Sequence, residues 1–206
     1  MKSLNWYFDF ISPFAYLQYV TLREQGLIRE INARPVLFAG LLKHWGHKGP
    51  VEIPAKRAMT YQHCHWLAEK HGIPFKTPPY HPFHPLMPLR LTLSMDCDPD
   101  LIDFLFRGIW EMGLDPASDG MRTLVRQTFG DIDIEDRCGN PEVKAALVDS
   151  TQKAIEVGVF GVPTLQVGNR LFWGFDMTEM ALEFAHGNVD FKSGEYGRLE
   201  QLPGMD

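Results

Sequence analysis

A serine at position 12 lies where an aromatic segment gives way to a helix. Leu4–Phe10 has the composition of a β-strand, and Ser12-Pro13 is typical of a helix start, with a hydroxyl at the N-cap and a proline in the first turn, where its missing N–H costs nothing. A hydroxyl donor and the positive end of a helix also both favour an anion such as a thiolate. From this segment alone a plain helix cap is the simpler interpretation.

A second segment with possible chemistry, Gly161-Val162-Pro163-Thr164, lies far along the chain. A cis peptide bond before Pro163 would expose the backbone N–H and C=O of Val162, and an extended peptide can pair with such groups as an added strand. Since only about 5–6% of X–Pro bonds in folded proteins are cis, an ordinary trans-proline turn is the alternative interpretation of the dipeptide.

The elements that must position these groups alternate between strand and helix at the two ends of the chain. A strand at Leu4–Phe10, a helix at Pro13–Gln25 and a strand at Ile31–Phe38 predict a parallel β–α–β unit, and Pro35 favours an edge position for its second strand. From Gly40 onward the pattern is helical with proline-rich breaks. Helices are expected at Ala55–His71, Leu89–Met95, Asp100–Met112, Gly120–Phe129 and Pro141–Glu156, and a loop at Thr77–Pro88.

The β pattern returns at Thr164–Val167, which a tight turn joins to Leu171–Gly174 as a hairpin, and a helix is expected at Thr178–His186. This order predicts an α/β protein with a thioredoxin-like fold and an all-helical domain inserted between its two halves. Residues 1–39 and 157–206 would form the thioredoxin-like domain, and residues 40–156 the inserted helical domain. The polar tail after His186 would lie over the surface or dock on a partner subunit, and we expect a homodimer.

Composition narrows the class of protein. The 206 residues are 45% hydrophobic, the formal net charge is −6, and no basic run is present, which argues against nucleic acid or an anionic membrane as partner. No apolar run approaches the roughly 20 residues of a membrane-spanning helix, and the N-terminus does not resemble a secretory signal, so we expect a cytoplasmic protein. The three cysteines form no Cys-x-x-Cys pair, which excludes a dithiol oxidoreductase and gives no support to a metal site.

Several motifs together resemble a known family. Phe8–Leu17 is similar to the opening of the 2-hydroxychromene-2-carboxylate isomerases, which are relatives of kappa-class glutathione transferases and of DsbA. Val159–Thr164 is similar to the cis-proline loop of that family, and Phe172–Asp176 to its Trp-Gly-x-Asp segment. The resemblance implies isomerisation of 2-hydroxychromene-2-carboxylate to trans-o-hydroxybenzylidenepyruvate in aromatic catabolism, with glutathione as the cofactor. The glutathione thiol would add to the ring, the ring would open, and the thiol would leave after a bond has rotated.

The resemblance also implies site residues. Ser12 would be the catalytic residue that holds the glutathione thiolate, and Val162 with Pro163 would pair with the glutathione backbone. Asp176 would hold the γ-glutamyl ammonium or, alternatively, would cap the following helix together with Glu179. The remaining glutathione-binding positions are Lys56, His47 and Met177, although a surface lysine is the common alternative for Lys56, and the family more often has asparagine at position 47 and arginine or serine at position 177.

Other residues are weaker candidates for metal or substrate binding. His63 and His65 are two positions apart on a helix and therefore do not share one metal ion easily, so no metal is expected. Lys56 and Arg57 are candidates to bind the carboxylate of a small aromatic substrate. His81 and His84 could rim the substrate pocket or simply pack, and the same choice applies to the aromatic residues Trp6, Phe38, Trp45 and Trp173. The alternatives to the isomerase are a kappa-type glutathione transferase and a non-catalytic thiol-binding or peptide-binding protein.

Overall fold

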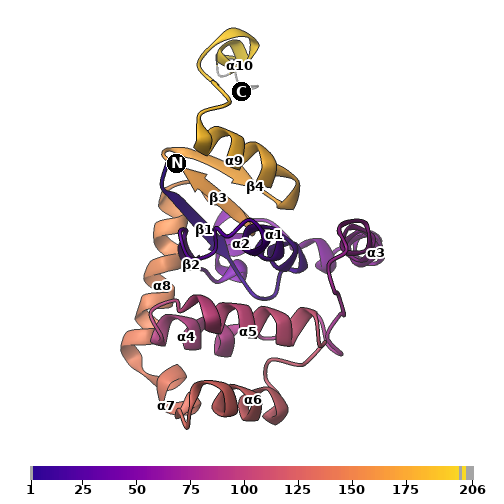
Figure 1. The fold of residues 1–206 in the computed structure, drawn as a ribbon, viewed down its shortest axis with the longest axis vertical. Coiled ribbons are helices and arrows are strands. Elements are labelled where there is room, and N and C mark those ends of the chain that lie inside the picture. Colours follow the sequence, from indigo (N-terminus) through magenta and orange to yellow (C-terminus); the bar gives the residue numbers. More distant parts are fainter. Residues whose placement is uncertain (1, 200, 203–206) are drawn as a thin grey trace.

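The computed structural model describes residues 2–199 and 201–202, and these residues contain a four-stranded mixed sheet (Figure 1). Its strands are β1 (Leu4–Phe8), β2 (Asn32–Pro35), β3 (Thr164–Val167) and β4 (Arg170–Trp173), in the order β2-β1-β3-β4. β1 runs parallel to β2 and antiparallel to β3, and β3 and β4 form a hairpin. The parallel β–α–β unit, the edge position of the strand that contains Pro35, and the C-terminal hairpin are therefore confirmed.

Helices surround this sheet. They are α1 (Pro13–Glu24), α2 (Phe38–Trp45), α3 (Pro54–His71), α4 (Leu86–Ser94), α5 (Pro99–Trp110), α6 (Asp119–Phe129), α7 (Ile134–Gly139), α8 (Pro141–Glu156), α9 (Thr178–His186) and α10 (Gly194–Leu199), with 3₁₀ turns η1 (Pro50–Glu52) and η2 (Phe175–Met177). In Figure 1, α4 to α7 lie below the sheet, α3 lies to one side, and α10 lies beyond α9. Between β2 and β3, the described residues form helices, turns and loops without a strand.

Two expected strands are too long, and the expected loop at Thr77–Pro88 ends early because α4 begins at Leu86. The observed strands are shorter than the expected ones at Leu4–Phe10 and Ile31–Phe38, because the carboxyl group of Asp9 binds backbone groups that lie beyond the ends of both strands. It accepts hydrogen bonds from the backbone N–H of Ile11 (3.1 Å) and of Phe38 (2.9 Å), and Phe38 begins α2, which the sequence did not predict. The short helices α7 and α10 were also not expected, and α10 lies within the tail. Residues 200 and 203–206 of that tail lie outside the described residues.

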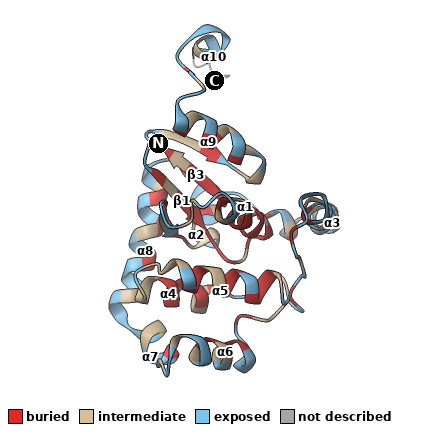
Figure 2. Cartoon of the chain, viewed as in Figure 1, coloured by how far each residue is buried: buried red, intermediate tan, exposed pale blue. Residues whose placement is uncertain are grey.

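The sheet has an apolar layer on each face, and alternate residues of β1 belong to different layers. Trp6 and Phe8 stack at 4.2 Å between ring centroids, within a large core that also contains Phe106 of α5. In Figure 2 buried residues colour much of the strands, α1 and α5. Tyr7 belongs to a smaller cluster with Leu41 of α2, Ala154 of α8 and other residues. Both ends of the helical segment thus pack on the sheet itself, and the division at residues 40 and 156 is proposed as an approximate one.

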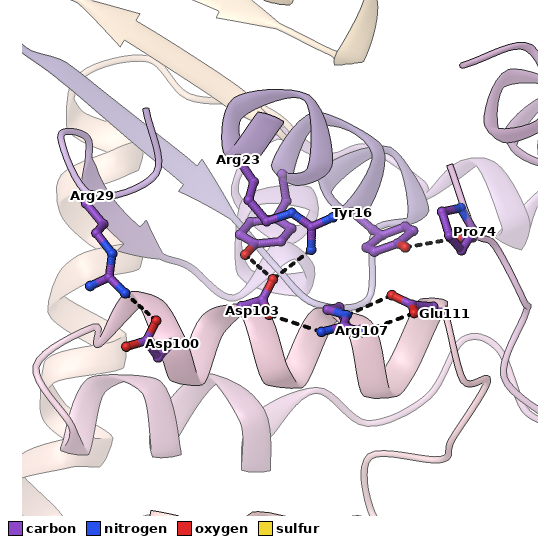
Figure 3. A network of polar contacts seen from close by, with 9 residues as sticks. Tyr16, Arg23, Arg29, Pro74, Asp100, Asp103, Arg107 and Glu111 are labelled. Carbon is purple, nitrogen blue, oxygen red and sulfur yellow. Dashed lines mark hydrogen bonds and ion pairs between the residues drawn. The ribbon is translucent and has the colours of Figure 1, made fainter. Parts of the chain in front are cut away.

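A polar network joins α1 to α5 (Figure 3). Asp103 accepts hydrogen bonds from the hydroxyl of Tyr19 (2.5 Å) and from the guanidinium of Arg23 (2.9 Å), and Arg107 lies 3.7 Å from its second oxygen. The hydroxyl of Tyr16 also donates to the carbonyl of Pro74 at 2.6 Å. Because Ser12 caps the start of α1, this network fixes the helix that positions the candidate catalytic residue.

We expect Asp103→Asn to lower the free energy of unfolding by about 1–3 kcal/mol, because a half-buried acceptor of two hydrogen bonds loses its charge. Asp100→Asn is the matched control, since Asp100 lies on the same helix and pairs with Arg29, but its side chain is 65% exposed. The control should change stability by less than about 0.5 kcal/mol. Urea unfolding of both variants measures the difference, and equal losses would contradict the importance of the network.

Candidate functional site

Ser12 ends the turn that leads from β1 into α1. Its side chain is buried, and its hydroxyl oxygen accepts a hydrogen bond from the backbone N–H of Ala15 at 3.2 Å, so the predicted N-cap is confirmed. Pro13 has no N–H, and within the described residues nothing accepts a hydrogen bond from the N–H of Phe14. The start of α1 therefore offers a hydroxyl, one free backbone donor and the positive end of the helix dipole.

The loop before β3 meets this helix start. The Val162-Pro163 peptide bond is cis, and the hydroxyl of Ser12 donates to the carbonyl of Val162 at a long 3.4 Å. No acceptor in the described part of the chain pairs with the N–H of Val162, whereas the carbonyl of Pro163 accepts a hydrogen bond from Gly174 at 2.8 Å. The two segments singled out in the sequence are thus brought together, and a second backbone donor is free beside the first.

A cleft of about 810 Å³ opens along α1 from Phe14; Val162 and Pro163 line it, and Ser12 lies behind them, outside the cleft wall itself. Its walls come from α1, the Val162-Pro163 loop, the segment from Trp173 to Glu179, the later turns of α3, and α9. The lining residues include Phe14, Thr21 and Gln25 of α1; His63, Leu67, Lys70 and His71 of α3; Val162, Pro163, Trp173, Phe175 and Asp176; and Glu179, Glu183 and His186 of α9. A volume of this size falls within the range of ligand-binding pockets.

The other site residues predicted from the sequence have different positions. Asp176 lines the cleft but does not cap α9, because it lies in the 3₁₀ turn η2 and Met177 is the N-cap residue without a side-chain cap bond; the capping-box interpretation is therefore wrong. Met177 packs against the large core and is not part of the cleft wall. Lys56, at the start of α3, and His47, after α2, are both exposed and also lie outside the wall.

Two basic residues that the sequence analysis did not single out do line the cleft. Lys70 and His71 form the last turn of α3 and face the cleft together with His63 and Leu67. The spacing of these four residues, i, i+4, i+7 and i+8, is that of one helix face, and it was the signal available in the sequence. Glu179 and Glu183 of α9 also line the cleft, so its wall carries acidic as well as basic residues.

A buried glutamine fixes the segment that carries Asp176. Gln18 of α1 accepts a hydrogen bond from the indole of Trp6 (2.9 Å) and donates to the carbonyl of Gly174 (3.1 Å) and to the hydroxyl of Thr178 (2.8 Å). All of its polar groups are therefore satisfied, although its side chain is completely buried. Sequence reasoning missed this residue, whose signal was a polar side chain on the apolar face of α1.

The aromatic residues divide between core and surface. Trp6 is fully buried in the core, and Phe38 packs in the smaller cluster with Val162. Trp173 lines the cleft with half of its surface exposed, and its indole lies against Gly161, where a side chain would collide with it. The indole of Trp45 is partly exposed and donates to the carbonyl of Val159 at 3.0 Å.

The chain's own thiols are poorly suited to be nucleophiles. Burial raises the pKa of Cys64 to about 12 and the pKa values of Cys97 and Cys138 to about 11, so all three are protonated at neutral pH. A thiolate in the cleft would therefore have to come from a bound molecule.

Two other features are absent from the described residues. They contain no group of three or more possible metal ligands. Within the same part of the chain, no helix is long and apolar enough to cross a membrane.

Comparison with known proteins agrees with the resemblance seen in the sequence. The profile of the DSBA-like thioredoxin domain matches residues 3–184. A protein named glutathione S-transferase kappa 2 from Caenorhabditis elegans is 25% identical over 182 residues, which cover 81% of each chain. A 2-hydroxychromene-2-carboxylate isomerase from Sphingobium xenophagum is 28% identical over 189 residues, which cover 85% of this chain and 93% of the relative.

A solved structure of 2-hydroxychromene-2-carboxylate isomerase superimposes with a TM-score of 0.77 at 25% identity, covering 90% of this chain and 94% of the other. The predicted thioredoxin-like α/β fold is therefore confirmed.

Proposed function

The chain belongs to the family of DSBA-like thioredoxin domains, and we propose that it is a glutathione-dependent isomerase that converts 2-hydroxychromene-2-carboxylate to trans-o-hydroxybenzylidenepyruvate. The observation that carries the proposal is the meeting of Ser12 with Val162 beside a large cleft, because it provides a hydroxyl for a sulfur and a free backbone donor for a peptide. The isomerases and the kappa transferase among its relatives support an enzyme that uses glutathione.

The residues present fit glutathione. The free N–H of Val162 suits the backbone of an extended tripeptide, and the hydroxyl of Ser12 with the free N–H of Phe14 suits its sulfur. Asp176 and Glu179 of the cleft wall suit the γ-glutamyl ammonium. The resemblance-based positions Lys56, His47 and Met177 stay predictions for the remaining contacts.

The chain's part in the reaction follows from these positions. When bound, glutathione supplies a thiolate that adds reversibly to the substrate and leaves again. The Ser12 hydroxyl and the N-terminus of α1 favour the ionised sulfur, so that it can react at neutral pH. Lys70 and His71 are the basic residues of the cleft that suit the substrate carboxylate, and the rings of Phe14 and Trp173 provide the apolar wall for a flat bicyclic substrate. The cleft thus supplies binding and charge stabilisation.

A glutathione transferase of kappa type is the second candidate, favoured by the relative of that name. It would use the same sulfur site, but it would join glutathione to an electrophile and release the conjugate. A non-catalytic thiol or peptide binder would use only the free backbone edge at Val162.

We expect total thiol to stay constant during many turnovers of a chromene carboxylate, because an isomerase returns its glutathione. Thiol titration of the reaction mixture and mass spectrometry of the product measure this, with Ser12→Ala as the impaired control. A product of unchanged mass supports the isomerase. A stoichiometric loss of thiol with an adduct of increased mass would favour the transferase, and glutathione binding without any product would favour the binder.

A further inference from the structure

The turn from Asp9 to Ser12 has each of its central peptide groups held by a hydrogen bond. The N–H of Ile11 donates to the carboxylate of Asp9 and the N–H of Ser12 to the carbonyl of Asp9, both at 3.1 Å. The carbonyl of Phe10 accepts from the indole of Trp110 at 2.8 Å. The carbonyl of Ile11 lies 2.7 Å from Nε2 of His81. The peptide plane that precedes Ser12 is therefore clamped on both sides, and its carbonyl side is held by His81.

His81 lies in the loop between α3 and α4, and its own environment is well defined. Its ring packs against Trp110 at 5.4 Å and against Phe83 at 5.7 Å between centroids. Nδ1 lies 2.8 Å from the hydroxyl of Tyr61 on α3. Because a carbonyl oxygen can only accept, Nε2 must carry the proton that bonds to Ile11. Nδ1 of the neutral ring is then an acceptor for the hydroxyl of Tyr61, which also lies 3.1 Å from the backbone carbonyl oxygen of His81.

We propose that His81 is a positioning residue that fixes the Ile11–Ser12 peptide, and through it the Ser12 hydroxyl, while Tyr61 holds the other nitrogen of its ring. The part of the inference that concerns a bound thiol rests on the proposed function. The part that concerns the order of the turn does not depend on it. Burial lowers the pKa of His81, so the neutral ring that this arrangement needs is the form present at pH 7. Tyr61 also belongs to α3, the helix that supplies Lys70 to the cleft. His81 therefore links α3 to the turn from Asp9 to Ser12.

Two substitutions distinguish the roles of the two ring nitrogens of His81. In His81→Gln the amide nitrogen lies near the place of Nε2 and can still donate to the carbonyl of Ile11. In His81→Asn the amide oxygen lies near the place of Nδ1 and can only accept from Tyr61. His84→Ala is the control, since His84 is an exposed histidine of the same loop. All three variants are tested as the full chain.

The first readout needs no ligand. Amide hydrogen exchange at Ile11 and Ser12 should become roughly tenfold faster in His81→Asn, and it should stay close to wild type in His81→Gln and His84→Ala. Exchange at Leu105, a fully buried residue inside α5, reports global destabilisation and should not change. Equal exchange at Ser12 in the Asn and Gln variants, or equal acceleration at Leu105, would overturn the proposal. Both variants have an amide side chain and differ in which ring nitrogen they replace. A folding defect common to both variants would therefore also count against the proposal.

The second readout is the pH at which bound glutathione ionises. It should rise by roughly one unit in His81→Asn and should return toward wild type in His81→Gln. A wild-type titration in His81→Asn, with Ser12→Ala shifted, would overturn the positioning role and leave the proposed function standing. If wild-type protein does not bind glutathione, the proposed function fails, and the exchange experiment alone still decides whether His81 orders the turn.

Discussion

Replacement of Ser12 by alanine is expected to raise the pKa of bound glutathione's thiol by about one to two units. The reason is the loss of a hydrogen bond from the hydroxyl to a charged sulfur, worth about 1.5–3 kcal/mol, where 1.36 kcal/mol corresponds to one pKa unit. Near pH 7, where a thiol with a raised pKa is mostly protonated, the thiolate fraction and the turnover number should fall by about 10-fold to 100-fold. Ultraviolet absorbance of the thiolate, followed against pH, measures the shift directly.

The N-cap role of Ser12 must be separated from this effect. The same hydroxyl oxygen accepts a hydrogen bond from Ala15, and loss of an N-cap costs about 0.5–2 kcal/mol of stability. Ser12→Gly removes the hydroxyl but retains most of the cap preference, so its thiol titration should shift as far as that of the alanine variant.

The matched control for the cap is Ser118→Ala. Ser118 caps α6 with the same 3.2 Å bond, to the N–H of Met121, and α6 does not contribute to the cleft wall. This variant should lose stability without a change in the thiol titration. A wild-type titration in Ser12→Gly would show that Ser12 is only a cap.

Much of the fold could be predicted because local signals and tertiary structure agree. Asp98-Pro99 and Asn140-Pro141 combine a capping side chain with a proline at the first helical position, and both do begin helices, with cap bonds of 2.8 and 2.7 Å. The hairpin of β3 and β4 follows from its alternating pattern and from the turn at Gly168, whose φ is 63°. At these places the sequence neighbours make the decisive hydrogen bonds.

The rest depended on contacts between distant segments. Helix α2 was missed because residues 35–38 are apolar like a strand, and the bond that ends the strand comes from Asp9, 29 positions away. His81 contacts Ile11 across 70 positions, and Gln18 reaches Gly174 across 156. The pattern of apolar residues within one helix does not indicate which distant residue its side chains contact. The residues that position the site were therefore harder to find than Ser12 and Val162, which have local motifs.

Asp9 is the second position where a large effect is expected. Its carboxyl group is completely buried and, within the described residues, forms no ion pair; its two oxygens accept from the N–H groups of Phe38 and Ile11. Burial raises the pKa of Asp9 to about 7, and the two hydrogen bonds offset only part of that rise. Because the pKa is higher in the folded than in the unfolded chain, folding favours the protonated group.

The sign of the pH dependence follows from that difference. The contribution of Asp9 to stability is fully present below pH 4, where the unfolded chain is also protonated, and it is lost as the pH rises through about 7. A pKa that is about three pH units higher in the folded chain than in the unfolded chain corresponds to at most about 4 kcal/mol. Other carboxyl groups titrate in the same range, so the effect of Asp9 must be measured as a difference between wild type and a variant.

Asp9→Asn removes the titration but leaves one backbone N–H facing an amide that cannot accept from it. The variant should therefore be about 1–3 kcal/mol less stable than wild type at pH 4.5, because a buried donor loses its partner. At pH 8.5 it should be at least as stable as wild type, because it has no buried charge.

Urea unfolding at the two pH values tests this reversal, with Asp149→Asn on the exposed face of α8, where Asp149 pairs with Lys153, as the control in which no reversal is expected. The charge formed on Asp9 near pH 7 lies one turn before Ser12, where it opposes a thiolate at the start of α1. Asp9 therefore affects both the stability of the fold and the ionisation of a sulfur bound beside Ser12. An unchanged difference between wild type and Asp9→Asn at the two pH values would contradict the titration of Asp9 near pH 7.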